Sequence, residues 1–150
     1  MKTILVVSAL SIALLVSVVP LVAHHAFSAE FDNSRPLNMR GVFVEMDWVN
    51  PHSWVKFEVT LPDGTVQLWM AETPPPNQLI RQGWRRNEIG VGDVIQVNGA
   101  AAKNGSPRMW ASNVRILVQG GTTLEEPKVV LNMFSQNPEG VPEGLLPPTD

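Results

Sequence analysis

The alternation of apolar and polar side chains along residues 42–61 limits the folds open to this chain more than any other feature. Every even-numbered side chain in residues 42–48 is apolar, and so is every odd-numbered one in residues 55–61. A period of two is typical of strands, so we expect two strands, with Val42, Val44, Met46 and Trp48 in the inward set of the first. The Pro-Asp-Gly run at residues 62–64 predicts a tight turn into a third strand at residues 66–70.

The order of the remaining elements predicts a closed barrel. Three prolines at residues 74–76 stop the third strand, because proline cannot donate to a sheet. Pro76 is suited to open a short helix with Leu79 and Ile80 as its apolar contacts, and Gly83 is suited to end it. Two more strands follow at residues 94–100 and 108–117, and we expect Trp110, Val114 and Ile116 to face inward. Three strands, a helix and two strands is the order of a mainly β, five-stranded OB-like barrel.

The first residues resemble an export signal. Lys2 precedes an apolar run that ends near Val22, and Ala23 is a small residue suited to precede the cleavage site. Cleavage there makes residues 1–23 a signal peptide, His24 the first mature residue, and the protein periplasmic or secreted. Two alternatives remain open, which are cleavage after Ser28 and no cleavage, since about 20 apolar residues can span a bilayer.

Composition bounds the rest of the chain. We expect one domain at residues 24–117, with an N-terminal arm at 24–36 whose aromatic rings pack on the barrel. Gly120-Gly121 is expected to mark the end of the domain, and the proline-rich residues 118–150 are expected to form a mostly disordered tail. The apolar residues 129–134 are the exception, and we expect them to dock on the barrel or on a partner. The formal net charge of −3 argues against a nucleic-acid partner. There is no cysteine, so an exported form of the chain depends on its core, a metal or a partner for stability.

Several motifs together resemble a family of small exported bacterial proteins without an assigned function. They are the arm at residues 23–32 (Ala-His-His-Ala-Phe-Ser-Ala-Glu-Phe-Asp), residues 48–54 (Trp-Val-Asn-Pro-His-Ser-Trp), the Gly83-Trp84 pair, and Gly-Asp-Val at 92–94 followed by Gly99. The resemblance covers roughly residues 20–117 and implies an exported small barrel. It implies no reaction.

Three histidines suggest a copper site. If His24 is the mature N-terminus, its α-amine and imidazole can bind one ion, and an imidazole from His52 or His25 adds a third nitrogen. Amine and imidazole nitrogens suit copper(II). Glu30, Asp32 and Asp47 are candidates for a fourth ligand or for holding a ring through its other nitrogen. The alternative is that the three histidines are structural or incidental, since no spacing-defined zinc motif is present.

A second interpretation is a non-metal binding module. Trp54 and Trp69 are expected to face outward from the second and third strands, the face on which barrels of this type bind oligomers. Their ligand would be a glycan, a lipid-like molecule or an envelope protein. The membrane is expected as a partner only through an uncleaved signal, and the basic cluster Arg81, Arg85 and Arg86 is expected to be a solvated helix end. No arrangement of acid, base and nucleophile indicates an enzyme.

Overall fold

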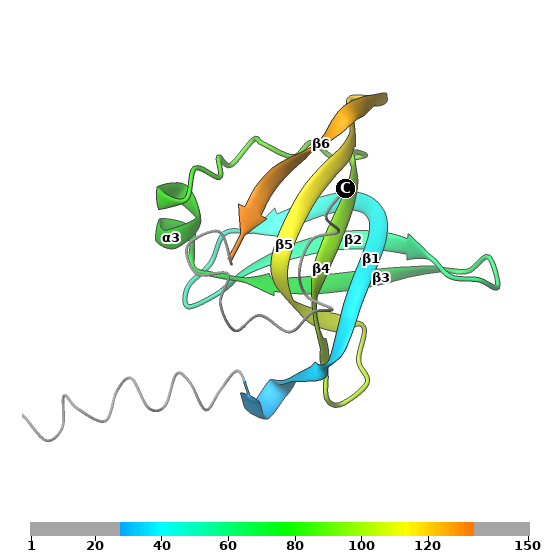
Figure 1. The fold of residues 1–150 in the computed structure, drawn as a ribbon, viewed down its shortest axis with the longest axis vertical. Coiled ribbons are helices and arrows are strands. Elements are labelled where there is room, and N and C mark those ends of the chain that lie inside the picture. The colour runs from blue at the N-terminus through cyan, green and yellow to red at the C-terminus, as the bar shows by residue number, and fades with distance from the viewer. Residues whose placement is uncertain (1–27, 134–150) are drawn as a thin grey trace, which may run out of the picture.

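The computed structural model describes residues 28–133, which form a small β-barrel (Figure 1). One helix, α3, lies between the third and fourth strands, as the sequence predicts. No helix among residues 28–133 is long and apolar enough to cross a membrane. The elements in chain order are β1 (Phe31–Asp47), β2 (Ser53–Thr60), β3 (Val66–Thr73), α3 (Pro76–Arg81), β4 (Val94–Ala102), β5 (Arg108–Gln119) and β6 (Thr122–Asn132).

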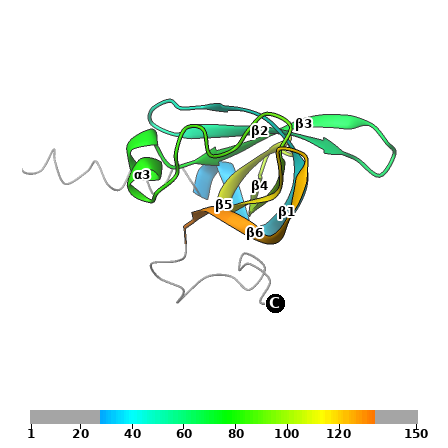
Figure 2. The same ribbon diagram turned by 90° about the horizontal axis from the view of Figure 1, so that it is seen from above.

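Five of the strands close on themselves. They follow the order β3-β2-β1-β4-β5, and a parallel pairing of β3 with β5 completes the ring. The long strand β1 turns this sheet into a barrel, because its first part pairs with β4 and its last part pairs with β2. The view from above shows the strands curving around one interior (Figure 2). The predicted OB-like barrel is therefore confirmed.

The inward set of β1 differs from the prediction. Phe43 is buried and Val42 is exposed. Phe43 lies opposite Phe57 and Glu45 lies opposite Lys56, so Val44 is an extra residue that forms a bulge. A bulge reverses the alternation, so Met46 packs against the core although Val42 does not.

The inward set of β3 is also the reverse of the expected one. Trp69 lies opposite the fully buried Phe57, and paired residues in an antiparallel sheet share a face. Trp69 therefore packs against the core, while Val66 and Leu68 are exposed. The prediction that Trp69 faces outward is wrong.

Strand β5 contains a second bulge with the same effect. Asn113 pairs with Asn98 and Ala111 pairs with Gly99, which leaves Ser112 as the extra residue. Val114 and Ile116 face the core, as predicted. Trp110 lies on the other side of the bulge and packs instead with Phe31, Ala100 and Ala102 in a separate small cluster, so its predicted inward position is wrong.

Most of the features predicted for helix α3 are confirmed. Pro76 stands in its first turn, and Gly83 follows with a φ of 97°, a left-handed conformation that glycine adopts without strain. Leu79 is fully buried and covers one end of the core. Ile80, predicted as a second apolar contact, is instead exposed.

The chain does not leave the sheet at Gly120-Gly121. These glycines form the turn of a hairpin, and β6 returns along β5 with Val130 and Leu131 buried (Figure 1). The predicted disordered tail is therefore wrong over β6. Residues 134–150 lie outside the described part of the chain.

The arm is described only from Ser28. Its Phe31 is buried against Trp110, with ring centroids 6.2 Å apart, which confirms that this ring packs on the barrel. Residues from Phe31 onward belong to β1 rather than to a separate arm. The predicted signal peptide, His24, His25 and Phe27 lie outside the described residues.

Candidate functional site

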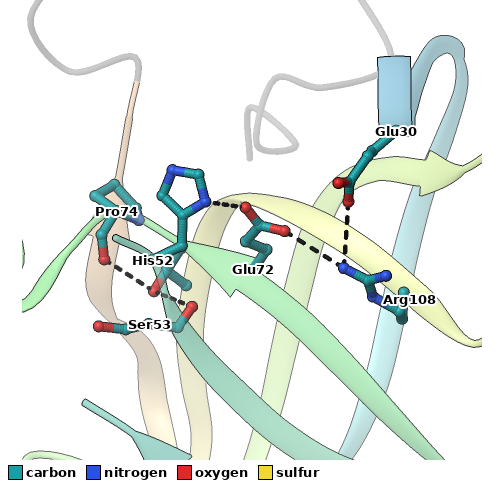
Figure 3. A network of polar contacts seen from close by, with 7 residues as sticks. Glu30, His52, Ser53, Glu72, Pro74 and Arg108 are labelled. Atoms are coloured by element: carbon teal, nitrogen blue, oxygen red, sulfur yellow. Dashed lines mark hydrogen bonds and ion pairs between the residues drawn. The ribbon is translucent and has the colours of Figure 1, made fainter. Parts of the chain in front are cut away.

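The site is organised around the contact between His52 and Glu72. His52 follows the Asn50–Pro51 peptide bond, which is cis, and immediately precedes β2. Glu72 lies near the end of β3, opposite Trp54. His52 Nδ1 contacts Glu72 Oε1, and the two side chains face each other across the end of the hairpin (Figure 3).

Backbone contacts fix the end of this hairpin. Ser53 N donates to the Pro74 carbonyl at 3.4 Å, and Thr73 Oγ1 donates to the Ser53 carbonyl at 3.2 Å. Ser53 and Thr73 are both fully buried. The backbone on either side of the His52–Glu72 contact is therefore held by the fold rather than by the ionic contact alone.

Arg108 extends the contact into a row of charges. Its Nη2 lies 3.6 Å from Glu72 Oε2 and 3.3 Å from Glu30 Oε2 (Figure 3). The parallel pairing of β3 with β5 places Arg108 opposite Met70, two residues from Glu72. Glu30 comes from the helical turn just before β1, so three distant segments meet here.

Burial decides the electrostatics of Glu72. The residue is only 5% exposed, and this burial raises the pKa of its carboxyl above the usual value. The neighbouring His52 opposes that rise in the Glu72 pKa, the Glu30 carboxylate adds to it, and Arg108 opposes it. Glu72 is therefore a buried carboxylate whose charge is supported by the basic side chains beside it.

Two tryptophans border the charged row. The Trp110 ring stands edge-on to His52 with centroids 5.7 Å apart, and the Arg108 guanidinium lies 4.7 Å from the centre of the Trp54 ring. A pocket of about 210 Å³ opens beside His52 and Trp54. It is lined by Glu30, Val49, Asn50, Pro51, His52, Trp54, Glu72 and Arg108.

A family model described as a family of unknown function, DUF6152, matches residues 12–110. The chain belongs to DUF6152. This confirms the predicted membership of a family without an assigned function. No curated protein matches the chain.

The site lies wholly within the residues that define the DUF6152 match. The match includes the arm, the His52 turn and β3, and it reaches Arg108 and Trp110 near its end. Strand β6 lies beyond it. The site is therefore part of the DUF6152 region, and β6 is an addition to the barrel that follows it.

Some of the predicted site residues of this DUF6152 chain come together. His52, Glu30 and Trp54 line the same pocket, although they come from the turn before β2, the start of the described chain and β2 itself. This pocket also shows that the described start of the arm lies at the His52 turn. His24 and His25 lie outside the described residues.

Asp32 and Asp47 are not part of this pocket. Asp32 Oδ1 accepts hydrogen bonds from the backbone nitrogen and the hydroxyl of Ser34, and these bonds lower the pKa of its carboxyl. Asp47 lies 2.9 Å from Lys56 Nζ on the outer face of the barrel. Hydrogen bonds to Glu45 and then to Asp47 raise the pKa of the Lys56 amine. Both aspartates are therefore occupied elsewhere.

Sequence reasoning missed Glu72, Arg108 and the contact of Trp110 with His52. Glu72 lies in a strand where an acidic residue is expected to be solvated, and only the closure between β3 and β5 buries it. Arg108 was assigned only as the start of a strand. Arg108 also lies outside the sequence motifs that resemble the family, so the resemblance did not indicate a role for it.

The geometry leaves one nitrogen of His52 available for chemistry. With Nδ1 directed at Glu72, the lone pair of a neutral ring lies on Nε2, and the side chain is 40% exposed. Within residues 28–133, no group of three His, Cys, Asp or Glu side chains is arranged to hold a metal ion. The part of the chain that is described thus offers a single oriented imidazole with a carboxylate, Glu30, in the same pocket.

Proposed function

We propose that this protein is an exported copper-binding protein, periplasmic or secreted, with a site built from its mature N-terminus and His52. The α-amine and imidazole of His24 supply two nitrogens, and His52 Nε2 supplies the third. His25 is close in sequence and supports the same ion. The observation that carries the proposal is the contact of His52 Nδ1 with Glu72, which leaves Nε2 on the side of the ring away from Glu72 as the nitrogen for a metal ion (Figure 3).

Contact of one ring nitrogen with a carboxylate, as between His52 and Glu72, is common among metal-binding histidines. A ligating histidine usually donates its other ring N–H to a carboxylate, which sets its tautomer and makes the ring more basic. Glu72 fills this role for His52, and it is itself held beside Arg108. Nitrogen donors favour copper(II) over the other common divalent ions.

The proposal requires the mature N-terminus to reach His52. Ser28 is anchored by its carbonyl, which accepts a hydrogen bond from Lys103 Nζ at 2.7 Å. Two residues later, Glu30 lines the His52 pocket. Four further residues lead back from Ser28 to His24, a span of at most about 14 Å. Glu30 is available as an oxygen ligand if it leaves Arg108, from which it is 3.3 Å away.

The decisive experiment measures copper(II) binding by proteins with different first residues. Mass spectrometry of the exported protein should give His24 as residue one, and its electron paramagnetic resonance spectrum with one equivalent of copper(II) should show three nitrogen ligands. One alanine added before His24 turns its α-amine into a peptide nitrogen and should abolish this spectrum. His52→Ala should abolish it as well. An unchanged spectrum in either variant would refute the proposed ligand set.

Tryptophan fluorescence gives a second test. The Trp110 ring lies 5.7 Å from His52, so copper(II) held at His52 should quench it. Trp110→Phe should lose most of the quenching while binding copper with similar affinity. Trp84→Phe is the matched control, since Trp84 is buried in the core and contacts Trp48 rather than His52.

A second candidate function is supported by the position of Trp54. Its ring and the Arg108 guanidinium form one wall of the pocket, which suits a glycan, a lipid-like ligand or a segment of an envelope protein. Trp69 does not contribute, because it faces the core. Under this alternative, Trp54→Ala weakens binding by roughly 1–3 kcal/mol if its ring stacks on the ligand. His52→Ala leaves that binding nearly unchanged, which is the reverse of the copper result.

A further inference from the structure

A second surface borders the turn between β1 and β2 and shares Val49 with the His52 pocket. Trp48 and Val49 follow β1, while α3 and the segment after it carry Ile80 and three arginines, Arg81, Arg85 and Arg86. Both views place α3 and the β1–β2 turn at the same end of the barrel, opposite the tip of the β2–β3 hairpin (Figures 1 and 2). We call these six residues the arginine face.

Ring contacts join the two segments of the arginine face. The Arg86 guanidinium lies 5.0 Å from the centre of the Trp48 ring, and the Trp48 ring meets the buried Trp84 ring edge-on at 6.1 Å. Trp84 N in turn donates to the Leu79 carbonyl of α3. These contacts form a continuous connection from the turn to the helix, so the two segments present one surface.

The charge of this face is not neutralised. None of the ion pairs within residues 28–133 involves its three arginines, and all three are exposed. Glu88, an acidic residue nearby in the chain, lies 2.6 Å from Lys128 Nζ and is paired there. The whole chain has a formal net charge of −3, whereas this face carries three arginines.

Exposed apolar side chains accompany the arginines. Ile80 is 53% exposed and Val49 is 49% exposed. A half-buried tryptophan with apolar neighbours and clustered arginines is the composition of a surface that lies in the headgroup region of a membrane. Three positive charges without acidic partners are complementary to anionic phospholipids.

We propose that the arginine face docks the protein on an anionic phospholipid membrane, with Ile80 and Val49 entering the interface between headgroups and acyl chains. Arg81, Arg85 and Arg86 contact lipid phosphates, and Trp48 sits at the level of the headgroups. In this orientation the β2–β3 hairpin points away from the membrane. The His52 pocket opens beside the same turn, so the docked barrel holds that pocket near the membrane surface.

The chain has no cysteine, so a single introduced cysteine can carry an environment-sensitive fluorophore at one chosen position. Ile80→Cys reports from the arginine face. Leu68→Cys is the matched control, since Leu68 is 47% exposed on the hairpin at the opposite end. A label on residue 80 should shift to an apolar emission on vesicles that contain phosphatidylglycerol, and a label on residue 68 should stay aqueous. This readout depends on the labelled position, so an apolar N-terminus that inserts by itself does not imitate it.

Two further experiments test the role of charge. The variant with Arg81, Arg85 and Arg86 all changed to glutamine should bind the anionic vesicles roughly 100-fold more weakly, given about 1 kcal/mol for each charge near such a surface. The exposed Arg35 and Arg40 of β1, changed to glutamine together, should have a much smaller effect. Raising the salt concentration to 0.5 M should release the protein, because these charges are then screened.

Three outcomes would overturn the proposal. A label on residue 80 that stays aqueous on anionic vesicles would show that the face does not meet lipid, and an acidic protein would then be the better partner for the arginines. An equal response on vesicles of phosphatidylcholine alone would remove the role of charge. Equal responses at residues 68 and 80 would indicate adsorption without a preferred face. None of these results would alter the copper experiments, whose readout is at His52.

Discussion

Glu72 and Asp93 are both buried carboxylates, and the fold uses them in different ways. They are 5% and 4% exposed, respectively. Asp93 accepts hydrogen bonds from two backbone nitrogens, those of Gly90 and Gly120, each at 2.8 Å. Glu72 instead meets the side chains of His52 and Arg108. One carboxylate holds the backbone, and the other holds side chains beside a pocket.

The difference explains which region is suited to chemistry. The partners of Asp93 join the segment before β4 to the β5–β6 hairpin, and its backbone carbonyl accepts from Phe43 N next to the β1 bulge. Its environment is therefore part of the barrel closure. The partners of Glu72 are side chains at the surface, His52 and Arg108, which can rearrange when a ligand binds. Burial alone does not distinguish a structural acid from a functional one, but the kind of partner does.

The largest effect should come from Asp93→Ala. The substitution removes two charge-assisted hydrogen bonds and leaves the Gly90 and Gly120 N–H groups without their acceptor, so the free energy of unfolding should fall by about 2–4 kcal/mol. Urea denaturation measures this loss. Asp93→Asn keeps one carbonyl oxygen and should lose about half as much. A loss below about 1 kcal/mol for the alanine variant would mean that the two turns are held by other contacts.

Glu72→Gln should separate stability from binding. The amide keeps the shape of the side chain and removes a buried charge, so the free energy of unfolding should change by less than about 1 kcal/mol at pH 7. Copper affinity should fall by about 10–100-fold, because the His52 ring loses the carboxylate that orients it. Calorimetric titration and urea denaturation of the same sample measure the two quantities. Equal affinity in the variant would show that Glu72 is a structural acid like Asp93.

The pH dependence of stability should carry the sign of the raised Glu72 pKa. A carboxyl with a raised folded pKa contributes stability that is fully present below its unfolded pKa, and this is lost as pH rises through the folded value. Glu72→Gln should therefore gain stability relative to the natural protein as pH rises from about 4.5, the ordinary glutamate value. Asp32→Asn is a control of opposite sign. The Asp32 pKa is lowered, so its contribution is lost as pH falls.

The smallest effect should come from replacing Lys56, whose amine lies 2.6 Å from the Glu45 carboxylate and 2.9 Å from the Asp47 carboxylate. Lys56→Met should lower the free energy of unfolding by less than about 1 kcal/mol, because both carboxylates remain in contact with water. The difference should shrink in 1 M salt. It should also shrink above pH 10.5, the ordinary lysine value, as the amine with its raised pKa loses its proton. A loss as large as that of Asp93→Ala would contradict the view that burial and the kind of partner determine how much an ionic contact contributes to the free energy of unfolding.

Local sequence patterns predicted the elements and their order. The Pro-Asp-Gly turn, the proline that opens α3 and the Gly83 that ends it all act within a few residues, so their signals are visible in a single chain. The tail was predicted from its prolines. Only the pairing of β6 with β5, which buries Val130 and Leu131, showed that part of it belongs to the sheet.

Which side of each strand faces inward was harder to predict. An alternating pattern is reversed by one extra residue, and the bulges at Val44 and Ser112 exchange the expected places of Val42 with Phe43 and of Trp110 with Met109. For β3 the turn at residues 62–64 sets the register in the structure. Leu61 N bonds the Thr65 carbonyl across the turn, and counting back from that pair along both strands places Trp69 opposite Phe57.

The sequence by itself therefore determined a β-barrel with a helix between its third and fourth strands and made His52 a candidate site residue, because turn residues and periodicity act over short distances. Only the tertiary structure decided that Glu72 is buried, that Arg108 reaches both Glu72 and Glu30, and that Trp110 stands beside His52. Arg108 and Glu30 lie 78 positions apart in the chain. The contacts among these site residues depend on the closure of β3 against β5, which no local pattern encodes.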